Sequence, residues 1–403
     1  MNEQVLSQGR PGARESAARA PLPREPALRV DGVMLMLVAA IVLLGLVMVT
    51  SASISIAARE GGEPFIYLER QLVLVLLGLI AGTVLYTVPT EALERLALPL
   101  LVAAGALLLL VLIPGLGHAV KGSRRWLSIA GLNFQVSEAA RVLVLIWVAS
   151  YCVRYESALR SSFGGLARPL GLLAVIAVLL LAEPDFGAAS VLFLTGFGVL
   201  FLGGAQLRWV FMMVLGAGGA MALLVLTTPY RMRRITGFID PWRDPFDTGF
   251  QLTQSLIAIG RGEWFGVGLG ASVQKLHYLP EAHTDFLFAV LAEELGLVGV
   301  ALTLGLFLAL CWRVFTLARR AQAAGLKFHA YLAAGFGLWL GLQAMINIGV
   351  NMGVLPTKGL TLPLMSYGRS SLIVALAWLG IIMRVHHEVA VHGRGARARE
   401  RRA

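Results

Sequence analysis

The stretch GVMLMLVAAIVLLGLVMV, residues 32–49, decides the class of fold. It contains no charged side chain, and about 20 apolar residues are enough for a helix to cross the hydrocarbon core of a bilayer. The whole chain agrees with this interpretation, because 57% of its 403 residues are hydrophobic and only 14% are charged. Soluble domains carry about 25% charged residues, so the sequence predicts a membrane protein.

Ten apolar stretches predict an all-α polytopic membrane protein with about ten transmembrane helices. They lie at about 33–53, 70–88, 97–114, 136–153, 169–183, 186–203, 208–228, 286–312, 329–352 and 364–384. An even number of spans predicts that both termini lie on the same side. The predicted domains are an Arg/Pro/Ala-rich tail at 1–31, a membrane domain at 32–385 and a basic tail at 386–403.

The positive charges predict the orientation. Most of the 34 lysines and arginines lie in the two tails and in the loops on the same side as the tails. The positive-inside rule therefore places both termini in the cytoplasm, and it accounts for the net charge of +11 without a nucleic-acid partner. Three basic clusters oppose this rule, at 121–125, 231–234 and 358–369. We expect them to meet an anionic lipid headgroup or a pyrophosphate; the alternative is that they are solvated loops.

One loop, residues 228–285, is much longer than the others. Loops of such length are uncommon without a function. Its segment GFQLTQSLIAIG, residues 249–260, is amphipathic and too short to span, so it is expected to lie in the interface or to fold back into the bundle. We expect the loop to act as a lid and substrate clamp.

Asp285 stands where this loop meets the eighth span, in LPEAHTDFLFAVLAEELG (279–296). A carboxylate at that depth is costly to leave unused. It could be a general base toward a sugar hydroxyl, a cation ligand or a proton relay. The alternative is helix capping by Thr284 or Asp285. His283 is interpreted as a loop residue on the sequence alone.

Other polar residues in the spans favour structural roles. Glu293 and Glu294 are predicted to bond to a neighbouring helix. Glu138 and Arg141, three residues apart, are expected to neutralise each other or to meet partners across the bundle. Asp185 in PDFG is predicted either to cap the next helix or to act in function. The ninth span carries Gln343, Asn347 and Asn351, which predict interhelical contacts. The sequence has no P-loop, HExxH or GxSxG motif, and its two cysteines show no metal spacing.

Seven motifs together resemble a known family. They are TSAS (50–53), GSRRW (122–126), QVSEAAR (135–141), EPDFGAA (183–189), GFQLTQSLIAIG (249–260), LPEAHTDFLFAVLAEELG (279–296) and NIGVNMGVLPTKGLTLPLMSYG (347–368). In this order, over about residues 35–385, they resemble the SEDS family (shape, elongation, division and sporulation). The PEAHTDF and PTKGLTLP segments resemble its division branch, the FtsW-like chains, more than its elongation branch, the RodA-like chains.

The resemblance implies a SEDS-type bundle and a peptidoglycan glycosyltransferase of the bacterial inner membrane at the division septum. Its substrate would be lipid II, an undecaprenyl-pyrophosphate disaccharide-pentapeptide. Asp285 matches the essential aspartate of the family and would take the proton from the acceptor 4-hydroxyl. Undecaprenyl pyrophosphate would leave, and cationic side chains would stabilise its charge. The candidates for this role are Arg124, Arg125, Arg234 and Lys358.

Further predictions follow from the resemblance. Other predicted substrate-binding residues are Trp126, Glu138, Gln254, Lys275, His283 and Ser366. A divalent cation, Mg²⁺ or Mn²⁺, could sit beside Asp285, although the sequence shows no dedicated cage. The expected partners are a class B penicillin-binding protein (FtsI-like) and the divisome proteins FtsQ, FtsL, FtsB and FtsN. The sequence departs from the family pattern at Lys121, Glu263, His277 and Arg369.

Two other functions compete with polymerisation. A lipid II flippase would use the same basic groups for headgroup passage and Asp285 as a proton relay. It would need charges through the full depth of the membrane, whereas most ionisable groups here crowd the predicted outer face. A non-catalytic scaffold could recruit division proteins through its arginine-rich tails, but it would not require Asp285.

Overall fold

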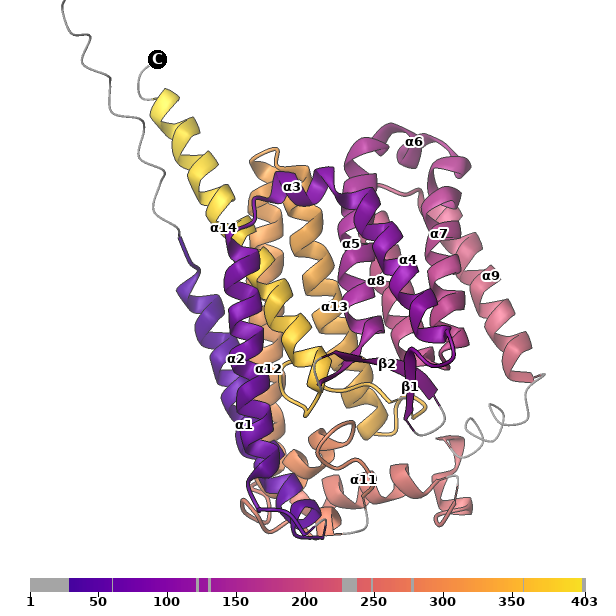
Figure 1. Ribbon diagram of the computed structural model, residues 1–403, viewed down its shortest axis with the longest axis vertical. Helices are drawn as coiled ribbons and strands as arrows, with labels where there is room; N and C mark the ends of the chain where they lie inside the picture. The colour runs from indigo at the N-terminus through magenta and orange to yellow at the C-terminus, as the bar shows by residue number, and fades with distance from the viewer. Residues whose placement is uncertain are drawn as a thin grey trace, which may run out of the picture.

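The computed structural model of the chain describes residues 29–59, 61–120, 123–129, 132–226, 238–247, 249–276, 279–357 and 359–400. Ten long helices occupy the ten predicted spans (Figure 1). They are α1 (Gly32–Arg59), α2 (Ile66–Thr87), α4 (Ala97–Leu112), α5 (Val136–Arg154), α7 (Phe163–Ala182), α8 (Phe186–Leu202), α9 (Leu207–Leu226), α12 (Leu287–Ala323), α13 (Lys327–Asn351) and α14 (Arg369–Glu400). In the described part of the chain, seven are long and apolar enough to cross a membrane, and α4 and α8 are shorter apolar helices. The polytopic helical architecture predicted from the sequence is confirmed.

The two ends of the bundle carry different short elements (Figure 1). One end, here named the Asp285 end because α12 begins there, carries a small sheet and α11 (Phe250–Gly262). The other, here named the opposite end, carries α3 (Thr90–Arg95) and α6 (Glu156–Ser161). Two 3₁₀ turns, η1 (Pro241–Arg243) and η2 (Gln274–Leu276), belong to the long loop. Helix α11 packs against α12, so the amphipathic segment folds back onto the bundle as predicted.

The sheet was not predicted. Strands β1 (Gly117–Val120), β2 (Ser123–Ile129) and β3 (Leu132–Gln135) are antiparallel in the order β1-β2-β3, with Trp126 opposite Gln135. Its strands are short and come from one loop between two spans, where apolar length gives no signal. Because β3 runs directly into α5 at Val136, the sheet fixes residues 123–126 of the GSRRW motif at the Asp285 end.

Helices α5 and α13 form the centre of the bundle. In the most apolar 18-residue stretch of each helix, 83% of the residues of α5 and 72% of those of α13 are buried. The corresponding share for the peripheral α2 is 22%. Leu76, Val102 and Val178 on α2, α4 and α7 leave their apolar side chains exposed. In a bilayer such side chains meet hydrocarbon instead of water, so their exposure fits the predicted spans.

The start of α1 and the last part of α14 meet at the opposite end. The Arg29 amide donates to His387 Nδ1 at 3.1 Å, and Arg313 donates twice to Asp31, at 2.8 and 3.0 Å. Burial opposes the ionisation of Asp31, but hydrogen bonds from Arg313 and the Met34 amide outweigh it and hold the pKa of that carboxyl below its usual value. Helix α14 continues as a helix past the predicted end of its span at 384.

Helix α12 is broken near its start. Gly296 has φ 62° and ψ −160°, a conformation that side-chain-bearing residues rarely adopt. The backbone groups freed by this break are bonded by the glycine-rich segment after α11: the Val267 and Gly268 amides donate to the carbonyls of Glu293 and Glu294 at 2.9 and 3.1 Å. A broken helix is tolerated in a membrane protein where protein satisfies the freed groups. The nine residues before the break therefore form a short, braced helix that starts beside Asp285.

Candidate active site

The backbone of Asp285 is held by two asparagines of α13. The Nδ2 atoms of Asn347 and Asn351 donate to the Asp285 carbonyl at 2.8 and 3.0 Å. Asn347 also donates to the Leu360 carbonyl at 2.6 Å, and the Asn351 amide oxygen accepts from the Ala289 amide at 3.2 Å. The predicted interhelical contact is thus confirmed for Asn351, which bonds to α12, whereas Asn347 bonds to two loop carbonyls. Together the two asparagines fix the turn that carries the carboxylate.

The Asp285 carboxylate lies against the loop that follows α13. A methyl group in place of a hydrogen of Gly359 would stand 3.3 Å from Asp285 Oδ2. Asp285 is only half-buried. Helix α12 begins at Leu287 with Phe286 in the N-cap position, so neither Thr284 nor Asp285 occupies it, and the capping alternative at that position is wrong. Lys358, the neighbour of Gly359, lies outside the described residues.

His283 stabilises the turn that carries Asp285 through contacts with two tyrosines. Its ring forms a three-ring cluster with Tyr67 of α2 and Tyr367: it lies 5.1 and 5.5 Å from them between centroids, and the two tyrosine rings are 5.4 Å apart. The His283 carbonyl accepts from the Tyr367 amide at 3.0 Å. Contacts of this kind stabilise the position of the turn, and the predicted substrate contact of His283 stays a prediction.

Glu294 and Lys275 form a buried ion pair. Lys275 Nζ donates to Glu294 Oε1 at 2.6 Å and to Ser51 Oγ at 2.8 Å, and Ser51 in turn donates to the Glu294 carboxylate. Both side chains are at most 6% exposed. A buried lysine paired in this way joins α1, the long loop and α12, which indicates a structural role; its predicted substrate contact stays a prediction.

Glu293 is also fully buried and bonded within the protein. It accepts from the Ser272 hydroxyl and from the Val273 amide at 3.2 Å, and Arg261 Nη1 lies 3.4 Å from it. The structural roles predicted for Glu293 and Glu294 therefore agree with the contacts that the structure shows. Gln254, predicted to contact substrate, is half-buried on α11.

Glu138 and Arg141 are buried in α5 and pair with each other. Arg141 Nη1 also donates to Gln343 Oε1 of α13 at 3.0 Å, while Gln343 Nε2 donates to the Thr361 carbonyl at 3.0 Å. The expected mutual neutralisation is confirmed. Glu138 is engaged by an arginine inside the bundle, and its predicted substrate contact stays a prediction.

Arg125 holds the turn between α7 and α8. Its Nε and Nη2 atoms donate to the carbonyls of Glu183 and Pro184 at 3.0 and 2.6 Å, and Nη1 lies 3.7 Å from Asp185 Oδ1. Asp185 caps α8 through its bond from the Ala188 amide at 3.0 Å, as predicted for one of its two roles. Arg124 on the same strand is exposed, and Trp126 is half-buried.

Glu183 was not singled out from the sequence. Its side chain is fully buried, and among the described residues its two carboxylate oxygens have no hydrogen-bond partner. Burial raises the pKa of this carboxyl to about 8; the charge of Asp185 adds to the effect and that of Arg125 opposes it. The only signal in the sequence is an acidic residue at the end of an apolar span, next to an aspartate that already explains the turn.

The remaining predicted site residues lie partly inside and partly outside the described part of the chain. Ser366 is buried, and its Oγ accepts from the Leu362 amide at 3.0 Å, which braces its own loop; its predicted substrate contact stays a prediction. Gly187 at the start of α8 packs on Leu360, the residue after Gly359. The structure therefore brings Arg125, Asp185, His283 and Asp285 to the same end of the bundle. Arg234, Lys121 and His277 lie outside the described residues.

A match to a known protein family shows to which family the chain belongs. Residues 32–391 match the family model described as cell cycle protein, which covers FtsW, RodA and SpoVE. The chain belongs to the FtsW/RodA/SpoVE family. The predicted SEDS resemblance is thereby confirmed, because the match covers the motifs on which it rested.

Relatives within the FtsW/RodA/SpoVE family are similar over nearly their whole length. A protein of Thioalkalivibrio sulfidiphilus, named probable peptidoglycan glycosyltransferase FtsW, is 55% identical over 368 residues, 91% of this chain and 92% of that protein. A protein of Methylococcus capsulatus with the same name is 52% identical over 89% of this chain and 90% of that protein.

Solved structures of the family share the fold. The rod shape determining protein RodA of Thermus thermophilus has a TM-score of 0.67 and 33% identity, over 90% of this chain and 98% of that chain. A chain from a peptidoglycan synthase complex, studied for the coordination of polymerization and crosslinking, has a TM-score of 0.72 and 36% identity, over 90% and 99%. These similarities support the division branch in sequence and the SEDS bundle in structure.

Proposed function

We propose that the chain is a division-type peptidoglycan glycosyltransferase that polymerises lipid II, with Asp285 as the general base. The observation that carries this proposal is the placement of Asp285: two asparagines fix its backbone, and its carboxylate lies beside Gly359 at one end of the bundle. Similarity to proteins named peptidoglycan glycosyltransferase FtsW supports the reaction class.

The chemistry needs one proton acceptor and a stabilised leaving group. The carboxylate takes the proton from the acceptor 4-hydroxyl while that oxygen attacks the anomeric carbon of the donor. The bond from this carbon to the pyrophosphate oxygen breaks, and undecaprenyl pyrophosphate leaves. A single displacement inverts the α-linked donor to a β-linked product. A fixed turn is suited to this role because a general base must be held within hydrogen-bond reach of its proton.

Cationic side chains would stabilise the charge on the leaving pyrophosphate. Arg124 is exposed on β2 and supplies one such charge. Arg234 and Lys358 keep the role predicted from the sequence. Arg125 is engaged with the turn between α7 and α8, so its contribution is to place that turn and, through it, the start of α8 beside Leu360.

A divalent cation beside Asp285 remains a prediction. Among the described residues no three His, Cys, Asp or Glu side chains come together as a metal cage. Within that part of the chain the donors do not fit a dedicated protein site for Mg²⁺ or Mn²⁺, and we derive no step through one. The chelation of divalent ions in the polymerisation assay tests this prediction.

The partner and the location are part of the same proposal. We propose that the chain works with a class B penicillin-binding protein, at the division septum, with both termini in the cytoplasm. Similarity to a chain of a peptidoglycan synthase complex supports such a partner. The meeting of α1 and α14 at the opposite end supports termini on one side of the membrane.

Proteoliposomes separate the polymerase from the flippase. The purified chain and its transpeptidase partner are reconstituted with fluorescent lipid II, and glycan length and lipid II translocation are measured in the same preparation. We expect long glycan chains that disappear with Asp285→Ala, in a variant that still melts cooperatively and binds the partner. Translocation without polymer would overturn the proposal in favour of a flippase, and neither activity would favour a scaffold.

A further inference from the structure

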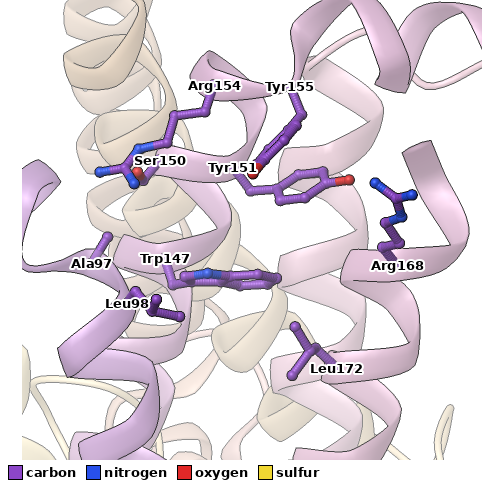
Figure 2. A pocket seen from close by; sticks show the side chains of 9 residues that line it. All are labelled: Ala97, Leu98, Trp147, Ser150, Tyr151, Arg154, Tyr155, Arg168 and Leu172. Atoms are coloured by element: carbon purple, nitrogen blue, oxygen red, sulfur yellow. The ribbon is translucent and has the colours of Figure 1, made fainter. Parts of the chain in front are cut away.

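A cavity of about 480 Å³ lies at the opposite end of the bundle, where α5 ends and α7 begins (Figures 1 and 2). It opens between α4, α5 and α7. Leu98 comes from α4, Trp147, Tyr151 and Arg154 from α5, and Arg168 from α7. A volume of this size is within the range that small-molecule sites occupy. The polymerisation chemistry at the Asp285 end makes no use of this cavity.

One wall of the cavity is a row of aromatic rings. Trp147 and Tyr151 have ring centroids 5.5 Å apart, and Tyr151 and Tyr155 have centroids 4.8 Å apart (Figure 2). Tyr151 donates its hydroxyl proton to the Gly165 carbonyl at 2.8 Å, which joins α5 to α7 and fixes the ring. The row therefore offers a rigid amphipathic surface, of the kind that is enriched where a membrane meets water.

The rim of the cavity is positively charged. Arg154 and Arg168 are both exposed, and Figure 2 shows their guanidinium groups on either side of the tyrosines. Within the described residues Arg154 donates to the Glu94 carbonyl at 2.8 Å, whereas a guanidinium has five donors. The residues lining the cavity in the described part of the chain include no aspartate or glutamate. The site is thus complementary to an anion.

The cavity also has an apolar exit. Leu98 and Leu172 on its margin are 57% and 39% exposed, on helices α4 and α7 whose outer faces carry further exposed apolar side chains. A ligand that combines an anionic head with a hydrocarbon part would match both features. Arg154 is the last residue of α5 and Arg168 lies in the second turn of α7, so both are near the helix ends, where a spanning helix would meet the headgroups.

We propose that this cavity binds the headgroup of an anionic phospholipid from the leaflet at the opposite end. Its phosphodiester would lie at the rim that carries Arg154 and Arg168, its glycerol over the aromatic row, and its acyl chains along α4 and α7. Basic pockets between transmembrane helices are suited to such headgroups, and guanidinium groups bind phosphate oxygens with paired hydrogen bonds.

Native mass spectrometry of the full chain tests the proposal. The protein is titrated with dioleoyl-phosphatidylglycerol, with dioleoyl-phosphatidylcholine and with inorganic phosphate, and bound molecules are counted. We expect one preferred phosphatidylglycerol, with about fivefold weaker binding in each of Arg154→Gln and Arg168→Gln, which corresponds to about 1 kcal/mol per arginine at a membrane surface. The matched control is Arg319→Gln, which removes an exposed arginine from α12 outside the cavity.

Four results would overturn the proposal. Equal binding of phosphatidylcholine would mean a groove that selects acyl chains alone, and equal binding of inorganic phosphate would mean a site for soluble anions. Unchanged phosphatidylglycerol binding in both arginine variants, or the same loss in Arg319→Gln, would mean that the lipid binds elsewhere. Melting temperatures measured in phosphatidylcholine nanodiscs show whether each variant keeps its fold, and Trp147→Leu supplies an independent variant of the aromatic wall.

Discussion

Asn347 joins two segments of the candidate active site through one amide group. Its Nδ2 donates to the Asp285 carbonyl at 2.8 Å and to the Leu360 carbonyl at 2.6 Å, so α13 sets the position of the catalytic turn relative to the loop beside it. These two hydrogen bonds bring the Asp285 carboxylate and the backbone of Gly359 together.

Removal of this amide should reduce turnover more than substrate binding. We expect Asn347→Ala to lower kcat roughly tenfold to a hundredfold, because small misplacements of a reacting group have effects of that size, with little change in KM for lipid II. Steady-state polymerisation kinetics check this. The control is Thr303→Val, which deletes a buried hydrogen bond within α12. A loss of kcat in the control equal to that in Asn347→Ala would mean that the asparagine acts only through stability.

Gly359→Ala tests the close approach of the loop to the carboxylate. The added methyl group would stand 3.3 Å from Asp285 Oδ2, tighter than most contacts of that kind, so the loop or the carboxylate must shift. We expect a fall in polymerisation of at least tenfold with an unchanged melting temperature. Gly260→Ala on α11, where the added methyl group meets nothing within 4 Å, is the matched control and should keep full activity.

The buried pair of Lys275 and Glu294 should behave as a structural unit. Lys275→Met leaves the Glu294 carboxylate buried without its cation, which destabilises proteins by about 3–5 kcal/mol. The double variant Lys275→Met, Glu294→Leu should recover most of this loss, measured as the melting temperature in detergent. If Lys275 bound substrate instead, the single variant would melt normally and lose only its affinity for lipid II.

Glu183 predicts how stability depends on pH. Its folded pKa of about 8 is above the unfolded value of about 4.5, so the folded state retains a proton that the unfolded state has lost. Stability from this group is present at low pH and falls as the pH rises from about 4.5 to about 8. We expect the wild-type melting temperature to decrease between pH 6 and pH 8.5 and Glu183→Gln to decrease less. Parallel curves for the two proteins would contradict the shifted pKa.

The spans and their polar residues could be predicted because the membrane makes both conspicuous. An uncharged run such as residues 32–49 has few alternatives to a transmembrane helix, and a glutamate such as Glu294 inside a span must have a partner. The identity of that partner could not be predicted. Lys275 lies in the long loop and reaches Glu294 only because Gly296 breaks α12 and the loop folds back on it.

The candidate site shows the same limit. Asp285 was conspicuous as a carboxylate at a span boundary, and Asn347 as an amide inside a span, but the bond between them depends on how α13 packs against α12. A hydroxyl in a loop motif, such as that of Ser366, is compatible with substrate binding and with loop bracing. The sequence alone could not show that Ser366 accepts a hydrogen bond from the Leu362 amide. Glu183 was overlooked because Asp185 beside it already accounted for the turn.

The central claim is that the Asp285 carboxylate removes the proton from the acceptor hydroxyl. Its most direct test is the polymerisation rate of Asp285→Asn with saturating lipid II and the transpeptidase partner, because asparagine keeps the shape of the side chain and removes the base. General base catalysis contributes about 10²–10⁴-fold, so we expect the rate to fall by at least a hundredfold while lipid II still binds. A rate within tenfold of the wild type would contradict the assignment of Asp285 as the base.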